Sequence, residues 1–340
     1  MDLYPLARRA LFHLDAERSH ELALRSFERF PRLATVPFAG RSVEDPVDLM
    51  GLHFRNRVGL AAGLDKDARA IEAFDRMGFG FVEVGTVTPR AQPGNPRPRL
   101  FRFPAQGAII NRMGFNNAGV DALVARVRAA HRSCVLGINI GKNRDTPLDR
   151  AVDDYLHCLE RVYAVADYVT VNISSPNTRH LRDLQHGEHF RSLLGTLCAA
   201  RDRLAKVHGR RRPLLVKLSP DLDPASLTAL ALAARELGVD GLIATNTTVT
   251  RPGLAEVPDG QEDGGLSGRP LQPLAAAALQ ALRANLGDQY PLIGVGGIDS
   301  PAEAVARCGA GADLVQIYTG FIYHGPQLVT ACAAALAHAR

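Results

Sequence analysis

Short apolar runs rich in Val, Ile and Gly recur along the chain from residue 58 onward. The runs are apolar almost without interruption and do not alternate between apolar and polar positions. Continuous apolarity is typical of parallel strands that are covered on both faces, so we predict eight buried parallel strands. The predicted strands span residues 58–63, 81–88, 135–142, 168–175, 214–219, 241–247, 292–298 and 314–320.

A segment with helical spacing follows later in the chain after each run. The predicted helices span residues 68–77, 120–130, 151–166, 188–207, 226–237, 274–286, 301–308 and 326–338. Eight strand-helix units in series predict an α/β protein with a (β/α)8 barrel, or TIM barrel. A doubly wound open sheet would also alternate strands with helices. We favour the closed barrel because polar clusters follow nearly all eight runs, and the loops of a barrel converge on one mouth.

Two segments interrupt the alternation of strands and helices. Residues 100–103 and 108–112 are short extended pieces on either side of Gln106 and Gly107, and we predict a hairpin, inserted after the second strand, that partly roofs the mouth. Residues 248–271 are rich in Gly, Asp and Pro, and we predict a lid or mobile loop there.

The first 40 residues lie outside the barrel pattern. Six apolar positions follow the spacing of an amphipathic helix: Leu3, Leu6, Ala7, Ala10, Leu11 and Leu14. A second helix is expected to begin after Asp15. We therefore divide the chain into an N-terminal α-helical extension, residues 1–40, and a barrel domain, residues 41–340. Periodicity alone favours an extension packed on the barrel over a surface that enters a membrane.

Composition removes several classes of protein from consideration. An apolar fraction of 46% over 340 residues is too high for a disordered or collagen-like chain. The net charge of +5 is small for this length and the arginines are dispersed, so we expect no nucleic-acid binding. The N-terminus lacks the apolar core of a signal peptide, and no run of about 18 apolar residues could span a bilayer. We therefore expect neither secretion nor a transmembrane segment.

The five cysteines are widely spaced and include no Cys-x-x-Cys pair, so we expect no metal site. We predict that they are small buried residues of a protein in a reducing cytoplasm. They are Cys134, Cys158, Cys198, Cys308 and Cys332.

Arginine outnumbers lysine by 36 to four. Lys66, Lys142 and Lys217 lie at the ends of predicted strands, and Lys206 lies on a predicted surface helix. A compact ammonium group cannot be replaced by a wide planar guanidinium, so the lysines at strand ends are candidates for chemistry. Lys217 lies in an apolar strand, where an unpaired ammonium is costly. It suits either a Schiff base or a positive charge beside a reduced flavin.

Asparagines recur at predicted strand ends and in the adjoining loops. A carboxamide offers a donor and an acceptor on one planar group, so converging asparagines can recognise the amide or imide edge of a planar heteroaromatic ligand. A single asparagine in such a place would more often be a turn residue. Five in converging positions favour the ligand, and they are Asn111, Asn139, Asn172, Asn177 and Asn246.

Glycines gather where the last two predicted strands end, at residues 294–298 and 318–320. This corner of a barrel binds phosphate through exposed backbone N–H groups, so we expect a phosphorylated cofactor or substrate. No Gly-x-Gly-x-x-Gly motif follows the first strand, so a dinucleotide-binding fold is not supported. After that strand, the small residues of segment 61–66 allow a close approach to the backbone, although Asp65 could simply cap the next helix.

Six motifs in a fixed order resemble those of the dihydroorotate dehydrogenases. They lie at residues 61–66, 111–115, 172–177, 245–247, 265–270 and 294–298, and the resemblance covers essentially the whole chain. Ser175 stands where the soluble class 1 enzymes carry cysteine, and a helical N-terminal extension is a feature of class 2. The chain thus resembles the quinone-dependent, membrane-associated class 2, which favours membrane contact for residues 1–40.

The resemblance implies one FMN per chain across the barrel mouth, with dihydroorotate beside it. The FMN contacts that it implies are Ala61, Ala62, Gly63, Leu64, Asp65, Lys66, Thr86, Asn139, Asn172, Lys217 and Thr245 for the ring and ribityl chain, and Gly268, Gly297, Tyr318 and Thr319 for the phosphate end. The substrate contacts that it implies are Lys66, Asn111, Arg112, Met113, Gly114, Phe115, Asn172, Asn177, Asn246 and Thr247.

The resemblance also implies the reaction, which oxidises (S)-dihydroorotate to orotate in pyrimidine (UMP) biosynthesis. Ser175 would remove the proton from C5 while a hydride leaves C6 for flavin N5. An unassisted serine is a poor base, so its proton must leave through neighbouring groups or water. Thr178 and Phe115 are candidates to shape that path.

A membrane quinone is implied as the final electron acceptor. His20, Arg102 and Tyr318 align with positions that line the quinone tunnel of the family, and each also has an ordinary interpretation as a surface or barrel residue. We expect a monomer bound peripherally to the cytoplasmic side of the inner membrane. Deletion of residues 1–40 is expected to abolish quinone reduction and membrane binding but to leave flavin on the barrel.

Two other functions compete with this interpretation. A Schiff-base lyase or aldolase would use Lys217 or Lys66 covalently, and it predicts a colourless protein that borohydride traps with its substrate. A flavin reductase acting on uridine in RNA would need a contiguous basic face or an added RNA-binding domain, and the sequence indicates neither.

Overall fold

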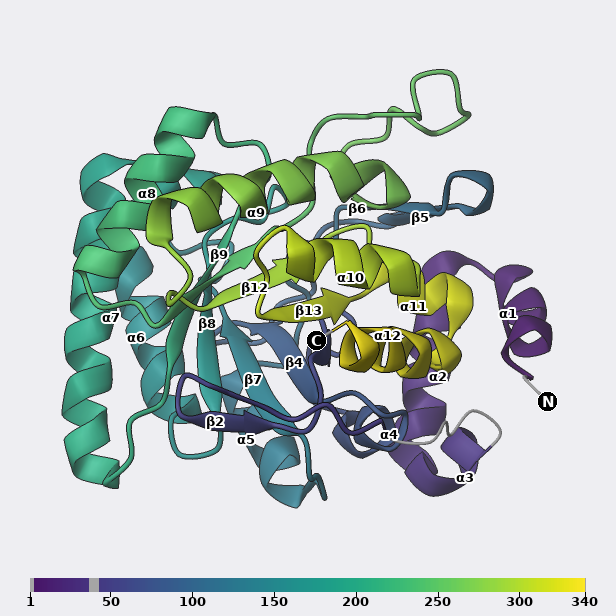
Figure 1. The fold of residues 1–340 in the computed structure, drawn as a ribbon, viewed down its shortest axis with the longest axis horizontal. Coiled ribbons are helices and arrows are strands. Elements are labelled where there is room, and N and C mark those ends of the chain that lie inside the picture. Colours follow the sequence, from purple (N-terminus) through teal and green to yellow (C-terminus); the bar gives the residue numbers. More distant parts are fainter. Residues whose placement is uncertain (1–2, 37–42, 340) are drawn as a thin grey trace.

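Eight parallel strands close into a barrel in the order in which they occur along the chain (Figure 1). The computed structural model describes residues 3–36 and 43–339. The barrel strands are β3 (Val58–Leu60), β4 (Phe81–Val87), β7 (Val135–Ile140), β8 (Tyr168–Asn172), β9 (Leu214–Leu218), β10 (Gly241–Ala244), β12 (Leu292–Val295) and β13 (Leu314–Ile317). Pairing of β13 with β3 closes the ring. The predicted barrel is confirmed.

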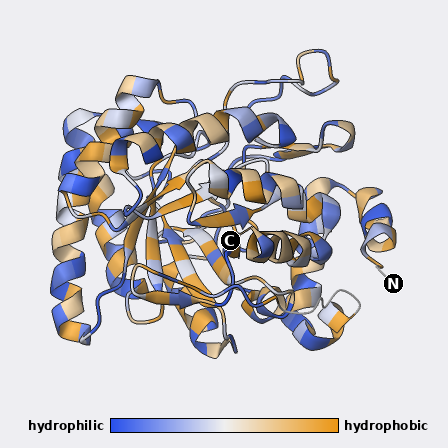
Figure 2. Cartoon of the chain, in the orientation of Figure 1, coloured by the Kyte–Doolittle hydropathy of each residue, from blue (hydrophilic) through white to orange (hydrophobic). Residues whose placement is uncertain are grey.

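All residues of these strands are buried, which explains the continuous apolar runs. Figure 2 shows mostly hydrophobic positions in the strands, interrupted by a few hydrophilic ones, while the surrounding helices carry both kinds. The amphipathic helices therefore cover the barrel with their apolar faces.

Eight helices follow the strands close to the predicted positions. They are α4 (Ile71–Arg76), α5 (Val120–Ala129), α6 (Ala151–Val162), α7 (Gly187–His208), α8 (Pro224–Glu236), α9 (Gln272–Leu286), α10 (Pro301–Gly309) and α12 (Pro326–His338). Helix α4 begins later than predicted because Ala68 has a φ of 59°, which a right-handed helix does not accommodate. Short 3-10 helices occur at Pro104–Gln106, Leu148–Arg150, Leu181–Gln185 and Arg269–Leu271.

The chain turns into a further helix, α11 (Thr319–His324), directly after β13. The C-terminal boundary predicted for the last strand, residue 320, is therefore wrong. The cause is Tyr318, whose φ of −135° and ψ of −79° leave the strand conformation and form the N-cap of α11.

The predicted hairpin is confirmed as β5 (Leu100–Phe103) and β6 (Ala108–Asn111), which are antiparallel. A third strand, β11 (Gly265–Gly268), pairs with β6, so the prediction of a lid or mobile loop over residues 248–271 is wrong at its C-terminal end. The β11 segment is rich in glycine and has no clear apolar alternation, so only its pairing with β6 makes it a strand.

A second hairpin, formed by β1 (Val47–Leu49) and β2 (Leu52–Phe54), was not predicted. Phe54 contacts Phe81, the first residue of β4, with ring centroids 5.4 Å apart. The hairpin packs with residues from the starts of several barrel strands in one buried cluster. It therefore closes the amino end of the barrel and leaves the carboxyl end for the site.

Three helices form the described part of the extension, namely α1 (Tyr4–Phe12), α2 (Ala16–Arg29) and α3 (Pro31–Thr35). The predicted start of α2 is confirmed, because the side chain of Asp15 accepts hydrogen bonds from the backbone N–H groups of Glu17 and Arg18. Figure 1 shows these helices beside α11 and α4 at one edge of the barrel. The boundary predicted between residues 40 and 41 lies outside the described residues.

Candidate active site

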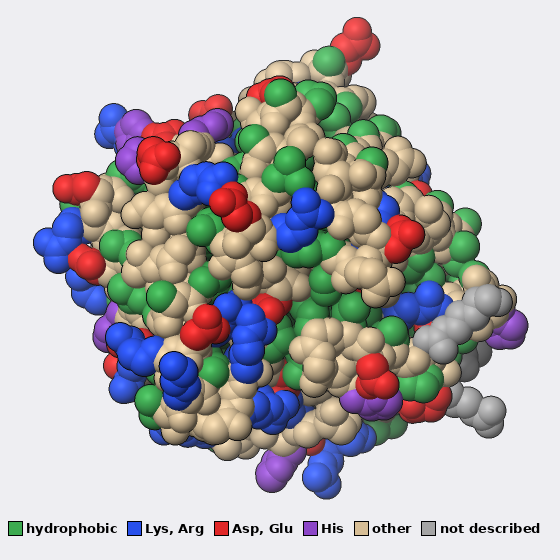
Figure 3. Space-filling model, turned by 60° about the vertical axis from the view of Figure 1, so that its left-hand side comes forward, with side chains coloured by type: hydrophobic (Ala, Val, Ile, Leu, Met, Phe, Trp, Pro, Cys, Tyr) green, Lys and Arg blue, Asp and Glu red, His purple; other side chains and the backbone are tan. Residues whose placement is uncertain are grey.

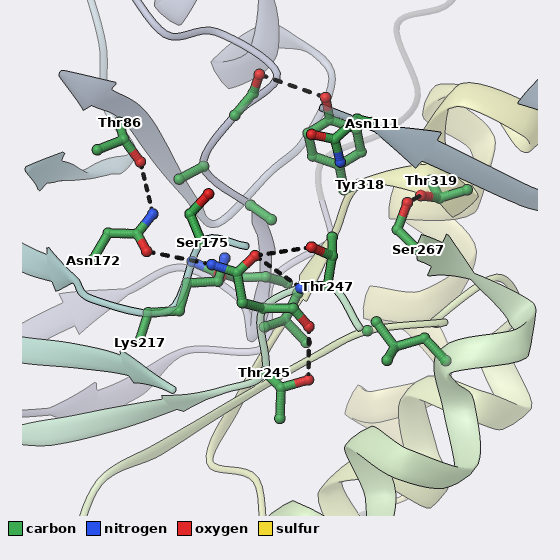
Figure 4. A pocket seen from close by; sticks show the side chains of 18 of the residues that line it. Thr86, Asn111, Asn172, Ser175, Lys217, Thr245, Thr247, Ser267, Tyr318 and Thr319 are labelled. Atoms are coloured by element: carbon green, nitrogen blue, oxygen red, sulfur yellow. Dashed lines mark hydrogen bonds between the residues drawn. The ribbon is translucent and has the colours of Figure 1, made fainter. Parts of the chain in front are cut away.

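A cavity with about 940 Å³ of empty space lies at the carboxyl ends of the barrel strands (Figure 4). Its walls come from the ends of every barrel strand except β7, and from the three-stranded sheet. Polar side chains dominate the part shown in Figure 4, where Asn172, Ser175 and Lys217 lie close together at the ends of the neighbouring strands β8 and β9. This is the end of a barrel at which active sites are built.

A buried carboxylate lies on β4 behind the cavity. Glu83 is fully buried and accepts hydrogen bonds from Asn139 Nδ2 at 2.8 Å, Tyr168 Oη at 2.9 Å and Gln316 Nε2 at 2.9 Å. Because the Glu83 oxygens accept these bonds, both amides turn their nitrogens toward it. The amide oxygens of Asn139 and Gln316 must then point elsewhere.

A chain of hydrogen bonds leads from Asn139, which Glu83 orients, to the cavity surface. The Asn139 Oδ1 accepts from the Thr86 hydroxyl at 2.5 Å, and Thr86 Oγ1 accepts from Asn172 Nδ2 at 2.8 Å. The Gln316 Oε1 is buried and has no hydrogen-bond partner among the described residues. A buried acceptor without a donor is costly, so this atom indicates a donor on a ligand.

Two lysines present unpaired ammonium groups to the cavity. Within the described part of the chain, Lys66 and Lys217 have neither a hydrogen-bond partner nor an ion pair, and both line the cavity. Burial lowers the pKa of Lys66 to about 8 and also lowers the pKa of Lys217, which the charge of Glu83 partly opposes. Partly desolvated cations of this kind require an anionic or electron-rich ligand.

The other two lysines lie elsewhere. Lys142 donates to the carbonyls of Asn143 and Thr146, at 3.2 and 2.8 Å, and does not line the cavity. Lys206 is exposed on α7. Of the four lysines, Lys66 and Lys217 are therefore the two that line the cavity, while Lys142 has a structural role.

Ser175 lies in the loop after β8 and lines the cavity. Its Oγ accepts a hydrogen bond from the backbone N–H of Asn177 at 3.3 Å, and Asn177 Nδ2 donates to Asn111 Oδ1 at 3.0 Å. Nearby in sequence, Thr178 is buried and its hydroxyl is without a partner among the described residues. A hydroxyl and a carboxamide from this loop thus lie at the same end of the cavity as a carboxamide from β6.

The opposite end of the cavity is lined by glycines. Gly268, Gly296 and Gly297 all have positive φ, at 94°, 117° and 79°. A Cβ on Gly297 would lie 2.4 Å from the Gln272 side chain, and a Cβ on Gly268 would lie 2.1 Å from the Gly107 carbonyl oxygen. These positions therefore require glycine, and they leave the backbone exposed to a ligand.

A second cavity, with about 1540 Å³ of empty space, lies between the extension and the barrel. Most of its lining is apolar, and it includes His20 and Arg102. Met113 and Tyr318 line both cavities, so these two side chains form a shared wall. The three residues that were predicted to line a quinone tunnel are brought together here.

Two polar side chains of the second cavity, His20 and Arg102, differ in charge and in their contacts. Burial lowers the pKa of His20 to about 3, assisted by the charge of Lys66, so this imidazole is neutral at physiological pH. Arg102 donates to the Leu14 carbonyl at 2.5 Å and lies 4.3 Å from the centre of the Phe12 ring. Arg102 therefore joins the hairpin to the turn between α1 and α2.

Residues 46–339 match the family model described as dihydroorotate dehydrogenase. The chain belongs to the dihydroorotate dehydrogenase family. Relatives named dihydroorotate dehydrogenase (quinone), from Burkholderia thailandensis and Burkholderia pseudomallei, are 55% and 56% identical to it over 336 residues. These matches cover 98% of this chain and 97% and 98% of the relatives, and they confirm the resemblance to the quinone-dependent class.

Solved structures of the dihydroorotate dehydrogenase family share the fold. Crystal structures of DHODH from Eimeria tenella, one in complex with ferulenol and one ligand-free, superpose with TM-scores of 0.88 and 0.87. Both are 39% identical to this chain in sequence, and the superpositions cover 95% of it and 90% and 94% of the Eimeria chains.

Most dihydroorotate dehydrogenase contacts implied by the resemblance line the first cavity. They are Ala61, Ala62, Gly63, Lys66, Thr86, Asn111, Met113, Gly114, Phe115, Asn172, Ser175, Asn177, Lys217, Thr245, Asn246, Thr247, Gly268, Gly297, Tyr318 and Thr319. The cavity also includes Ser267, Leu271 and Gln316, which were not predicted.

Four predicted contacts do not line the first cavity. Asp65 is fully buried and accepts from the backbone N–H groups of Arg69 and Ala70. These groups lie in the turn before α4, whose N-cap, Ala70, has no side-chain cap bond, so the alternative in which Asp65 caps the helix is wrong. Leu64 faces the second cavity. Asn139 lies behind Thr86, and Arg112 pairs with Glu262 and lies over the Phe101 ring. The direct ligand contacts that the resemblance implies for these four residues stay predictions.

Proposed function

We propose that this chain oxidises dihydroorotate to orotate and passes the electrons to a quinone, in the synthesis of pyrimidines. The observation that carries the proposal is the pair of adjoining cavities with one shared wall. The first is polar and holds two unpaired ammonium groups, and the second is large and mainly apolar. The names of the Burkholderia relatives, which specify a quinone, support the same conclusion.

FMN fits the first cavity on three observations. Gln316 Oε1 lacks a donor, Lys217 lacks an anionic partner on the cavity side, and the glycines at 268, 296 and 297 leave room at one end. We propose one FMN per chain, held at its ring end by Ala61–Gly63, Thr86, Asn172, Lys217 and Thr245 and at its phosphate end by Gly268, Gly297, Tyr318 and Thr319. When bound, FMN supplies hydride acceptance from the substrate and electron transfer to the quinone.

The substrate end of the cavity fits an anionic pyrimidine. Lys66 would bind the carboxylate of dihydroorotate, since its ammonium has no other partner in the described chain. Asn111 and Asn177 are held against each other by one hydrogen bond of 3.0 Å, which orients both for the ring edge. Asn246 and Thr247 line the same end. Substrate would therefore be fixed by one charge and several amides.

Ser175 is the proposed base that takes the proton from substrate C5. Its Oγ lies in the cavity and accepts from the Asn177 backbone N–H, a bond that stabilises negative charge developing on the oxygen. Among the described residues, neither a carboxylate nor a histidine hydrogen-bonds to it, so its own proton must leave by another route. Thr178, with its unpartnered hydroxyl, and Phe115 are the candidates to border that route.

We also propose peripheral attachment to the cytoplasmic side of the inner membrane through the extension. Leu6 on α1, Leu33 on α3 and Val36 directly after α3 expose 67%, 71% and 65% of their surface. Both helices also contribute residues to the lining of the apolar cavity. In the described chain no helix is both long and apolar enough to cross a bilayer. One chain supplies the lining of both cavities, so a monomer suffices. The proposed division into residues 1–40 and 41–340 follows these two roles.

Family membership favours this redox function over the Schiff-base alternative. The RNA alternative requires a contiguous basic face, and Figure 3 shows acidic and basic side chains interspersed over one face of the molecule. Neither alternative uses the second cavity.

The proposal is tested by the visible spectrum of the purified protein and by anaerobic addition of dihydroorotate. We expect flavin absorption that bleaches when dihydroorotate is added and returns when a quinone is supplied. Ser175→Ala should keep the flavin spectrum and lose most of the bleaching, by about 100-fold or more in rate, because it lacks only the base. A protein without flavin, or flavin that dihydroorotate leaves oxidised, would refute the proposal.

A further inference from the structure

A buried ion pair joins the extension to the barrel. Glu17 lies in the first turn of α2 and is only 8% exposed. Its carboxylate accepts from Arg99 through Nη2 at 2.7 Å and through Nε at 3.1 Å, and Arg97 adds a further bond at 2.9 Å. Arg99 is 5% exposed, whereas the Arg97 side chain is 72% exposed. The pair between Glu17 and Arg99 is therefore the desolvated one. It is bidentate, which fixes the relative orientation of the two side chains.

The other end of the Arg99 guanidinium organises a loop. Its Nη1 donates to the carbonyl oxygens of Pro93 at 2.6 Å and Asn95 at 2.8 Å. The loop approaches closely enough that a Cβ on Gly94 would lie 2.8 Å from this nitrogen. The hydrogen bonds found for the Arg99 guanidinium are thus divided between the Glu17 carboxylate and this loop.

Asn95 carries the connection to the substrate end of the cavity. Its Nδ2 donates to the carbonyls of Arg112 at 2.9 Å and Asn177 at 3.2 Å, and its backbone N–H donates to Met113 at 3.0 Å. A Cβ on Gly114 would lie 2.7 Å from the Asn95 side chain, so the two segments are in contact. Asn95 therefore fixes both backbone segments that carry the proposed substrate amides.

We propose that Glu17 is a positioning residue for substrate: through Arg99 and Asn95 it holds the segments around Met113 and Asn177 in place for binding dihydroorotate. The inference rests on the proposed function for the identity of the substrate. It assigns to the extension a role in the first cavity as well as in the second. Glu17 itself lines neither cavity, and its hydrogen bonds reach the substrate end through Arg99.

The charge of Glu17 also favours the binding of an anionic substrate, through its effect on Lys66. The charge of Arg99 lowers the pKa of Lys66 and the charge of Glu17 raises it. With the Glu17 carboxylate removed, Arg99 would stay charged and would favour the neutral form of Lys66. The loss of positioning and the loss of charge on Lys66 would both weaken the binding of an anion.

The test measures the affinity for dihydroorotate separately from the use of quinone. Anaerobic flavin reduction in the full-length, FMN-loaded protein is followed as a function of dihydroorotate concentration, and orotate binding is followed through the flavin spectrum. We expect Glu17→Gln to weaken both affinities by about tenfold or more, because displacements of about 1 Å at a site have effects of this size. The matched control is Glu28→Gln, on the same helix, where the carboxylate is 41% exposed and pairs, among the described residues, with Arg69 alone.

A double-mutant cycle separates this role from simple support of α2. If Glu17 acts through Asn95, Glu17→Gln combined with Asn95→Ala should weaken orotate binding by clearly less than the product of the two single effects, and what remains is the charge effect of Glu17 on Lys66. Additive effects, or a Glu17→Gln protein that binds orotate normally and shows only a raised KM for quinone, would overturn the inference.

If Glu17→Gln does not fold, Glu17→Asp moves the carboxylate while keeping its charge and is assayed in its place. Failure of the wild type and Glu28→Gln to bleach with dihydroorotate would instead refute the proposed function.

Discussion

Lys66 shows how burial sets the chemistry of a single residue. Its side chain lies at the carboxyl end of the first barrel strand, where desolvation brings the pKa from the ordinary range for lysine to about 8. Asp67, the largest electrostatic contribution, raises this pKa, and Arg99 lowers it. The group that would bind the substrate carboxylate is thus close to losing its charge under mildly alkaline conditions.

The binding of orotate should therefore depend on pH. The anion binds the protonated form of Lys66, which predominates below pH 8 and declines above it, so the Kd should be flat below about pH 7 and rise about tenfold per pH unit well above 8. Flavin difference spectra recorded with orotate between pH 6 and 10 measure this. Lys66→Met should bind weakly at every pH. A Kd for the wild type that stays constant through pH 9 would contradict the assignment.

At the scale of elements, the extension and the β5–β6 hairpin together enclose the apolar cavity. His20 comes from α2 and Arg102 from β5, and Arg102 is also bonded to the turn that precedes α2. Because burial keeps His20 neutral, it would meet a quinone as a hydrogen-bonding group and not as a cation.

His20→Ala should accordingly raise the KM for quinone by about tenfold, the effect of one lost hydrogen bond to a ligand. Anaerobic flavin reduction by dihydroorotate should stay within about twofold of wild type, since His20 does not line the first cavity. The control is His13→Ala, in the same extension but exposed at the end of α1. If flavin reduction by dihydroorotate and flavin oxidation by quinone were slowed equally, His20 would be a structural residue and not a quinone contact.

The elements that the sequence predicts well are those with a strong local signal. The eight barrel strands are visible because burial on both faces makes every position apolar, and α2 is visible because Asp15 caps it. Strand β11 and helix α11 were missed because pairing with β6 and the conformation of Tyr318 decide them. Glu83 and Gln316 were missed in the site, although a carboxylate inside an apolar run was as strong a signal as Lys217.

For the whole molecule, the important feature is that two cavities meet at one wall. Met113 and Tyr318 are the residues common to both linings, and the rest of each lining is separate. Dihydroorotate and quinone would thus approach from different sides and need not displace each other. Electrons alone would have to cross between the sites.

Steady-state kinetics should reflect this separation. When the concentrations of dihydroorotate and quinone are both varied, double-reciprocal plots should give parallel lines, because each substrate reacts with a different oxidation state of the enzyme. Intersecting lines would indicate that both substrates must be bound together before either reacts.

The scarcity of lysine has a practical consequence for handling the protein. Lys142 and Lys217 are buried and Lys66 faces a cavity, which leaves Lys206 as the lysine that is exposed on the surface. Figure 1 places its helix, α7, at the edge opposite α1 and α2. Attachment to a solid support through the amine of Lys206 would therefore orient the molecules alike, with the N-terminal helices turned outward and available to a lipid layer or to quinone in solution.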